Sequence, residues 1–237
     1  MNLEILEENV YYYKNAIEDP EKLVALIEES ELIENIKSAV KPWEEWSACS
    51  GQMYVYGQKK PTYRSQISAI GNIEEREKAE YIINTIKSAF ENVAAEYAAA
   101  KDVQEPVNLF PNFEINKYST GTMMGGHYDQ QEGDERLKFS MVMYLNDNYE
   151  GGEISFTIKG YDALTMEEKP GEDFDDPRNT DKITFGIKPE AGSVIIFPSS
   201  APYHHTAHLI KGGYKYMVPN HWLHGETPVE DEMPDAM

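Results

Sequence analysis

The sequence predicts an α+β fold that is mainly β, with helices packed against a barrel or sandwich of short strands. Two observations predict it. Before about residue 105 most segments have helical periodicity, whereas the rest is a series of short β-rich runs separated by Gly or Asn-Asp turns. With 237 residues, 41% of them hydrophobic, the chain can bury a substantial core in one structural domain.

The N-terminal region, residues 1–104, is expected to be a mostly helical support with one short strand at 53–56 (MYVY). Asp19-Pro20 is typical of an N-cap followed by the first helical residue. Asn72 begins an N-x-x-E capping pattern, which predicts a helix over 73–99. Apolar residues recur along that helix at helical spacing and predict one buried face: Ile82, Ile83, Ile86, Phe90, Val93, Ala94 and Tyr97.

Residues 105–228 are predicted to form the β core, followed by an acidic tail at 229–237 that is expected to fray. Strands are predicted in FEINKYS, KFSMVMYLN, EISFTIK, ITFGIK, SVIIFPS and YKYMVPNHW. An acidic stretch over 160–182 interrupts the series. Two interpretations of it remain open, a solvated insertion and a lid over a substrate site.

The charge of the chain limits its partners. It carries 21 basic and 42 acidic residues, a net charge of -21. Such a surface repels phosphate backbones and anionic membranes and favours cationic partners, so neither nucleic acid nor a membrane is expected. The start of the chain lacks a signal-peptide pattern. Cys49 has no partner for a disulfide and is more typical of a buried residue than of a nucleophile, which favours a cytoplasmic protein.

A candidate metal site begins with GGHYDQ. Residues i and i+2 of an extended strand share a face, so His127 and Asp129 would present an imidazole and a carboxylate side by side. A third ligand is available from His204, His205 or His208. Two histidines and one carboxylate leave three positions open on an octahedral metal, the pattern of non-haem Fe(II) oxygenases. A closed structural zinc site would need four ligands, and the one cysteine has no CxxC partner.

The turn after these histidines determines whether a lysine faces the same side of the sheet as the metal ligands. If 211–213 (KGG) is a three-residue hairpin loop, Lys215 pairs with Leu209, and His205 and Lys215 share the inward face. An inward lysine implies an anion, because burying it alone costs on the order of several kcal/mol. A dicarboxylate chelated to the metal at its other end would supply that anion. A two-residue turn would instead direct Lys215 to solvent, and both turns remain open.

Several motifs occur together and in order. Tyr118 stands nine residues before the H-x-D motif, MVMYLNDNYEGGEISF gives a strand and a GGE turn, and PEAG leads into VIIFPS. His205 is followed by Gly213 eight residues on and Lys215 ten residues on, a spacing that the other two histidines lack. With these motifs, residues 118–222 resemble the Fe(II)- and 2-oxoglutarate-dependent dioxygenases of the prolyl 4-hydroxylase type, including bacterial and phage members.

This resemblance implies a double-stranded β-helix core (jelly-roll, cupin-like), with the N-terminal helices packed on its larger sheet. It implies that His127, Asp129 and His205 hold Fe(II), which 2-oxoglutarate chelates through its 1-carboxylate and 2-oxo oxygens while O2 takes the remaining position. Succinate and CO2 are the expected co-products, and ascorbate is an expected accessory. The three ligands also suit Mn(II) or Zn(II), so the ligand set alone does not fix the metal.

The resemblance also assigns the cosubstrate pocket. The 5-carboxylate is expected at Lys215, helped by Tyr118 and by Ser140, which stands where relatives often have a threonine. Two positions depart from the pattern. The family's arginine near the start of the YLN strand falls on Leu137, and the spacing from Lys215 to Trp222 is one residue longer, so Trp222 is not assigned to the pocket.

The implied substrate is a prolyl residue in a peptide or protein, which the net charge would favour as a basic peptide steered by 160–182. The alternatives are another amino-acid side chain or a free amino acid, a nucleobase, a catalytically idle metal-binding jelly-roll that serves as an interaction module, and a structural zinc protein. The implied location is the cytoplasm of a bacterial or phage-infected cell. His221 and His224 are expected at the surface, solvated or hydrogen-bonded. The sequence does not predict the oligomeric state.

Overall fold

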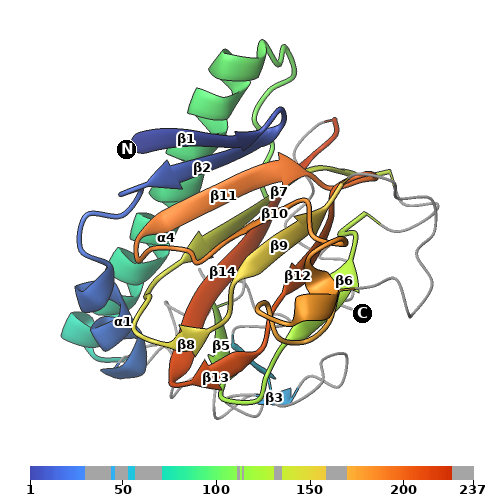
Figure 1. Ribbon diagram of the computed structural model, residues 1–237. Helices are drawn as coiled ribbons and strands as arrows, with labels where there is room; N and C mark the ends of the chain where they lie inside the picture. Colours follow the sequence, from blue (N-terminus) through green and yellow to red (C-terminus); the bar gives the residue numbers. More distant parts are fainter. Residues whose placement is uncertain are drawn as a thin grey trace.

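Two antiparallel β-sheets lie face to face in the computed structural model, with a helical layer on the outer side of the larger sheet (Figure 1). This arrangement confirms the predicted mainly β fold with helices on one sheet. Cys49 and the acidic tail lie outside the described residues. The structure describes residues 1–29, 71–110, 113, 115–130, 135–158 and 170–225, together with the backbone of 44–45 and 53–56.

Eight strands form the larger sheet, in the spatial order β1 (Asn2–Glu7), β2 (Val10–Lys14), β11 (Ser193–Pro198), β7 (Leu137–Tyr144), β14 (Tyr214–Leu223), β5 (Ile115–Ser119), β4 (Met53–Tyr56) and β3 (Glu44–Glu45). Side chains alternate between its faces. On β7, Met141 and Met143 belong to the core under the helices, whereas Val142 and Tyr144 belong to the core between the sheets. The inner face of β7 and its neighbours therefore forms one wall of the interior.

Four strands form the smaller sheet, in the order β10 (Phe185–Ile187), β9 (Ile154–Thr157), β12 (His204–Ala207) and β6 (Met124–His127). A separate pair joins β8 (Glu150–Gly151) and β13 (Ile210–Gly212), and a short 3-10 helix, η1, covers Pro177–Asn179. The Phe156 ring of β9 packs edge-on against Phe197 of β11, with ring centroids 5.0 Å apart. Aromatic and aliphatic side chains thus fill the space between the sheets on this side.

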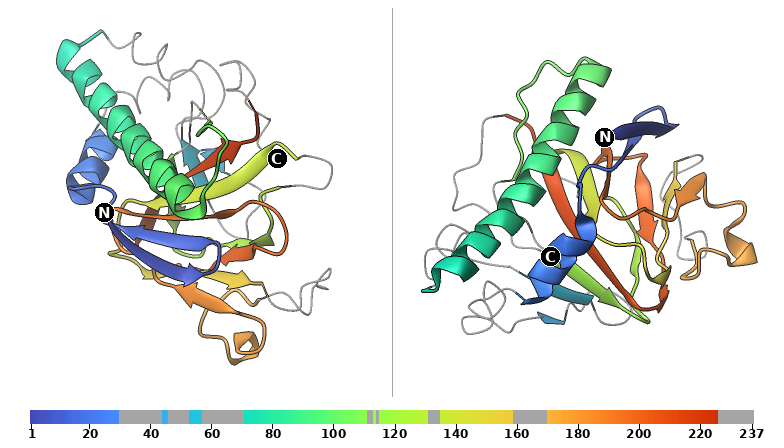
Figure 2. Two further views of the ribbon diagram at one scale, coloured as in Figure 1. Left: turned by 90° about the horizontal axis from the view of Figure 1, so that it is seen from above. Right: turned by 90° about the vertical axis from the view of Figure 1, so that its left-hand side faces the viewer.

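Helices α1 (Pro20–Glu29) and α4 (Ile73–Lys101) cover the outer face of the larger sheet (Figure 2). Both predicted caps are present: the Asp19 carboxylate accepts from Lys22 N at 3.1 Å, and the Asn72 side chain accepts from Glu74 N at 2.9 Å. All seven apolar residues predicted for the buried face of α4 are buried. Among the described residues, no helix is both long and apolar enough to cross a membrane.

The first fourteen residues form strands, which corrects the prediction of helices with a single short strand in the N-terminal region. β1 and β2 pair antiparallel, and β2 joins β11. The reason is that β2 is covered on both faces. Tyr11 and Tyr13 pack under the helices, whereas Val10 and Tyr12 face the space between the sheets. A strand buried on both sides lacks the period-2 pattern by which strands are recognised.

The KGG hairpin, one of the two turns that the sequence left open, does not form. β12 pairs with β9 and β6 in the smaller sheet, whereas Lys215 lies opposite Tyr118 of β5 in the larger sheet. Lys211 and Gly212 belong to β13, which pairs with β8. His205 and Lys215 nevertheless line the same cavity, because the inner faces of the two sheets oppose each other.

The acidic stretch lies partly outside the described residues, which resume at residue 170. Its described part is tied to β13 and to the residue before it. The carbonyl of Glu172 accepts from Leu209 N at 3.0 Å, and Asp173 forms an ion pair with Lys211 at 2.7 Å. Residues 170–182 are therefore anchored, and their role as a lid stays a prediction.

Candidate metal centre

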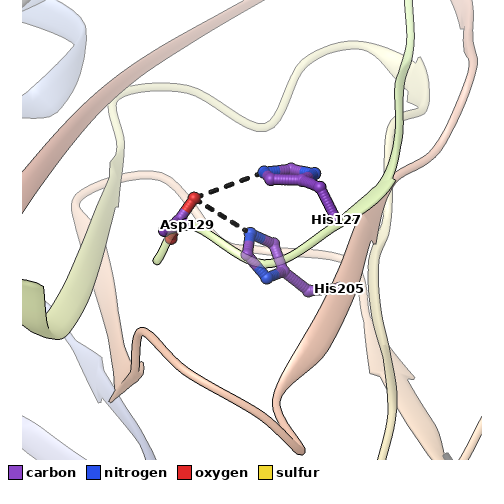
Figure 3. A group of neighbouring side chains, drawn as sticks. All are labelled: His127, Asp129 and His205. Carbon is purple, nitrogen blue, oxygen red and sulfur yellow. Dashed lines mark ion pairs between the residues drawn. The ribbon is translucent and has the colours of Figure 1, made fainter. Parts of the chain in front are cut away.

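Three potential metal ligands meet where β6 and β12 pair (Figure 3). His127 ends β6 and lies directly opposite His205 of β12, and Asp129 follows two residues after His127. The Nε2 atoms of His127 and His205 lie 3.3 and 3.7 Å from Asp129 Oδ1, and one ligand atom from each residue lies within 4.8 Å of the others. Donors at about 2.1 Å from one ion are about 3 Å apart in adjacent positions, so this spacing suits a single metal.

Backbone carbonyls orient both imidazoles. The carbonyl of Gly125 lies 2.8 Å from His127 Nδ1, and that of Tyr203 lies 3.2 Å from His205 Nδ1. A carbonyl can only accept, so each Nδ1 carries a proton, which leaves each Nε2, the nitrogen nearer Asp129, as the one that can bind a metal. Such hydrogen bonds fix the ring orientation and tautomer that a metal requires.

The pKa shifts of these three residues suit metal binding. Burial alone would raise the pKa of Asp129, but the charges of nearby histidines and the hydrogen bond from His127 hold it well below its usual value. Burial, together with the neighbouring His127, lowers the pKa of His205 to about 4. For His127, burial acts to lower the pKa, but its contacts with Asp129 outweigh burial and raise it. An ionised carboxylate beside imidazoles suits Fe(II), and a bound ion would hold both rings neutral.

A cavity of about 240 Å³ extends between the sheets from this group to Lys215. At about 30 Å³ per water molecule it has room for about eight waters, the size of a small dicarboxylate. Most of its wall is apolar. The apolar lining residues include Phe110, Phe113, Leu137, Val142, Ile154, Met217 and Pro219.

Lys215 is the cation at the other end of the cavity. Its side chain is 2% exposed, and Nζ donates to the carbonyl of Gly152 at 2.7 Å. Nζ also lies 4.9 Å from the ring centroid of Tyr144 and 5.9 Å from that of Tyr118. Burial, with the nearby Lys188, lowers the pKa of Lys215 to about 7. No described carboxylate forms an ion pair with it, so the site favours an anionic ligand.

Of the two other residues predicted for the cosubstrate pocket, one lines the cavity and the other is not among its described lining residues. Tyr118 lines the cavity next to Lys215, and its hydroxyl lies 3.9 Å from Met124 Sδ. Ser140 is not among the described lining residues, and it lies four residues along β7 from Tyr144, a separation of about 13 Å between the two Cα atoms. Nothing in this position supports its assignment to the 5-carboxylate, which stays a prediction. Trp222 packs in the core under the helices, in agreement with its exclusion from the pocket.

His221 is a cavity residue that the sequence interpretation placed at the surface. Its ring lies edge-on to Phe110, with centroids 5.9 Å apart. Burial lowers the pKa of His221, although the charge of Asp129 acts in the opposite direction. The sequence contains a signal for this position. His221 is six residues from Lys215 on the same strand, and residues at an even offset lie on the same face of a strand.

Comparison with known protein families identifies a domain within the chain. Residues 113–224 match the model of the 2OG-Fe(II) oxygenase superfamily, a span that contains the three ligands and Lys215. These residues form a 2OG-Fe(II) oxygenase domain. The enzyme is thus a dioxygenase whose family uses Fe(II), 2-oxoglutarate and O2, and its His-Asp-His group is present for the metal. The predicted jelly-roll fold and family resemblance are confirmed.

Solved structures share the fold. A prolyl-4-hydroxylase from Pseudomonas putida is 14% identical, with a TM-score of 0.55 over 92% of this chain and 94% of that one. A prolyl hydroxylase from Trichoplax adhaerens, in complex with a peptide fragment of hypoxia inducible factor, is 12% identical, with a TM-score of 0.53 over 91% and 83%. The carbocyclase SnoK from nogalamycin biosynthesis is 12% identical, with a TM-score of 0.55 over 92% and 80%. No curated protein sequence matches the chain.

Proposed function

We propose that the enzyme hydroxylates a prolyl residue in a peptide or protein, with conversion of 2-oxoglutarate to succinate and CO2. The observation that carries the proposal is one cavity with the three metal ligands on one side and the buried ammonium of Lys215 on the other. A dicarboxylate chelated at the metal matches both ends. The two prolyl hydroxylases of the same fold, one of them bound to a peptide, support the prolyl substrate.

In this proposal His127, Asp129 and His205 hold Fe(II), which when bound supplies the centre where 2-oxoglutarate and O2 react. The carbonyl hydrogen bonds at both Nδ1 atoms would hold the two imidazoles in the orientation that offers Nε2 to the ion. Lys215 receives the 5-carboxylate next to the Tyr118 ring, a charge-assisted contact of about 1.5–3 kcal/mol. The apolar walls keep water away from the reacting atoms.

The lining at the metal end of the cavity favours a substrate group that is uncharged and apolar. Phe110 packs against His221, and Pro219 lies two residues before it on β14. Apart from Asp129 and Lys215, the described part of the lining has no carboxylate, lysine or arginine. A pyrrolidine ring fits such a surface, whereas a charged side chain would lose its hydration there. The net charge of -21 favours cationic residues on either side of that proline.

A peptide panel tests this proposal. Proline-containing peptides of varied charge, each with a copy in which alanine replaces the proline, are incubated under air with Fe(II), ascorbate and 2-oxoglutarate. The expected result is gain of one oxygen atom on the proline with an equal amount of succinate, in the wild type but not in His205→Ala. Oxygen gain that is equal on the alanine copies would reject prolyl specificity. Equal rates on acidic and basic peptides would reject the preference for a basic substrate. We also propose a cytoplasmic location, given the single cysteine.

A second candidate is a small apolar molecule that is not a peptide. The likeness to SnoK favours it, because that carbocyclase has the same TM-score as the Pseudomonas putida enzyme. Succinate that forms slowly and without dependence on any peptide in the same assay would favour this candidate.

A further inference from the structure

The strand that carries His127 has an open edge. β6 is the last strand of the smaller sheet, and among the described strands it pairs only with β12 (Figure 1). Proteins usually protect such an edge with charged residues or proline, but the Met-Gly-Gly before His127 offers neither. The register of β6 against β12 shifts between Met124 and His127, so the regular part of the edge is the end at His127. An extended chain could add to that end as a further strand.

Solvent reaches the metal ligands from this side of the smaller sheet. The side chain of His127 is 26% exposed and that of Asp129 is 18% exposed, whereas that of His205 on β12 is 7% exposed. Gly125, on β6, is exposed, and a Cβ there would meet nothing within 4 Å. A peptide that approaches along β6 therefore meets the two more exposed ligands first, with no side chain at Gly125 in its way.

The hydrogen-bond pattern of β12 shows which position on β6 lacks an outward backbone donor. Successive residues of a strand direct their N–H and C=O groups to opposite edges. His208 N donates to the carbonyl of Glu153 across the pairing with β9, so His205, at an odd offset, directs its backbone groups to β6. His205 and its partner His127 therefore form a hydrogen-bonded pair. On the open edge, His127 is then a position at which a neighbouring strand makes no backbone hydrogen bond.

We propose that the substrate peptide adds to β6 as an antiparallel strand, with its target proline directly opposite His127. This proposal rests on the prolyl substrate proposed above. Proline has no N–H, so within a ladder it fits a position without hydrogen bonds on an edge strand, which the added strand would be. Residues directly opposite each other share a face, so the pyrrolidine ring lies beside the His127 imidazole, on the side of the metal ligands. In such a pair the two Cα atoms are only about 4.5 Å apart.

The same alternation makes a demand on the residue after the proline. Gly126 is next to His127 on β6, so its N–H and C=O point to the open edge. In antiparallel pairing the residue after the proline lies opposite Gly126 and exchanges both hydrogen bonds with it. The N–H of the second residue after the proline points away from β6 again. Binding therefore requires an N–H directly after the proline and none at the next position, and the net charge of -21 favours lysine or arginine at the peptide ends.

Three synthetic peptides test the proposal. The parent is acetyl-Lys-Lys-Val-Pro-Val-Val-Lys-Lys-amide, and two copies carry one N-methyl group each, either on the valine directly after the proline or on the next valine. Each is titrated with the full chain loaded with Mn(II) and 2-oxoglutarate, and binding is followed by NMR of the peptide. Paramagnetic Mn(II) broadens the signals of nearby protons, so the same spectra show which part of the peptide lies at the metal.

In the parent peptide the prolyl ring protons are expected to broaden most, with a decrease on both sides. The N-methyl group directly after the proline is expected to weaken binding at least about 10-fold, because it removes a hydrogen bond and holds the strand away from Gly126. The matched N-methyl group on the next valine is expected to stay within about 3-fold of the parent. Equal effects of the two groups, strongest broadening at the lysines, or no binding of the parent would each overturn the proposal.

A fourth peptide separates this proposal from the prolyl substrate itself. A copy with alanine in place of the proline keeps every backbone hydrogen bond to β6, so it is expected to bind within about 3-fold of the parent. A much weaker alanine copy would contradict docking through the backbone. Failure of the prolyl substrate would appear instead as absence of oxygen gain on proline in the peptide panel, whatever the N-methyl groups do. Oxygen gain on proline with equal effects of the two N-methyl groups would keep the prolyl substrate and reject strand addition.

Discussion

His127 and His205 lie directly opposite each other on β6 and β12, with ring centroids 4.3 Å apart and both Nε2 atoms turned toward the same oxygen of Asp129. The pairing of two strands that are far apart in the sequence thus sets the spacing of the two imidazoles. Packing changes in these strands should therefore alter metal affinity even where no ligand is replaced.

Gly126→Ala tests this link between packing and metal affinity. A Cβ at Gly126 would collide with the His204 ring, 2.8 Å from its Nε2, and would lie 3.1 Å from Thr206 Oγ1. We expect a loss of about 1–3 kcal/mol in the free energy of unfolding and weaker metal binding, because β6 must shift away from β12. The matched control is Gly125→Ala, whose Cβ meets nothing within 4 Å. Denaturant unfolding and metal titration check both, and equal effects of the two changes would contradict the prediction.

Metal binding should stabilise the fold through the three ligands. At a free metal concentration of 100 Kd, we expect about 2.7 kcal/mol of added stability, seen as a higher Tm that a chelator reverses. His205→Ala should lose this response. His208→Gln should keep it, because the His208 ring is bonded to Ser155 and to the carbonyl of Glu172 and is not among the described lining residues. Thermal melts with Mn(II), which avoids oxidation, measure the response. A full Tm rise in His205→Ala would exclude it as a ligand.

Replacement of Lys215 should weaken the binding of 2-oxoglutarate and leave metal binding unchanged. Lys215→Ala removes the buried ammonium, and we expect 2-oxoglutarate to bind about 10- to 150-fold less tightly, with metal affinity unchanged. Lys188→Ala is the control, because Lys188 Nζ is bonded to the carbonyls of Tyr149 and Gly151 and is not among the described lining residues. Calorimetric titrations measure both affinities. Equal losses in the two variants would point to a general effect of positive charge.

Cosubstrate affinity should also depend on pH through Lys215. Its pKa is lowered to about 7 without an anion, and a bound carboxylate raises it, so binding takes up a proton above pH 7. We expect the Kd for 2-oxoglutarate to be flat below about pH 7 and to rise up to about tenfold per pH unit above it. Lys215→Arg keeps its charge at these pH values, and the slope should vanish. Titrations between about pH 6.5 and 9 measure the slopes. Parallel slopes in both proteins would assign the dependence to another group.

The sequence predicted what depends on local spacing. The buried face of α4 followed from helical periodicity, and the triad and Lys215 followed from motif spacing. The turn before β14 stayed open, because the partner of that strand is β5, about a hundred residues earlier, and pairing over such a distance leaves no local signal. For the same reason the sequence did not identify which residues of β14 face the cavity.

The positions of Ser140 and His221 show most clearly what could not be predicted from the sequence. Ser140 was assigned by resemblance to the lysine end, but the register of β7 against β11 and β14 places it opposite Phe197 and His221. Once β14 is known to run along the cavity, the even offset from Lys215 identifies His221. Register between strands, which the sequence leaves open, was the missing quantity.

The most direct test of the oxygenase itself is succinate formation from 2-oxoglutarate under air with Fe(II). The wild type is compared with Asp129→Ala and with Ser155→Ala, which lies outside the described lining. We expect succinate that depends on Fe(II) and O2 in the wild type and in Ser155→Ala, and its loss in Asp129→Ala. Absence of succinate from wild-type protein that is confirmed to contain iron would contradict the oxygenase activity.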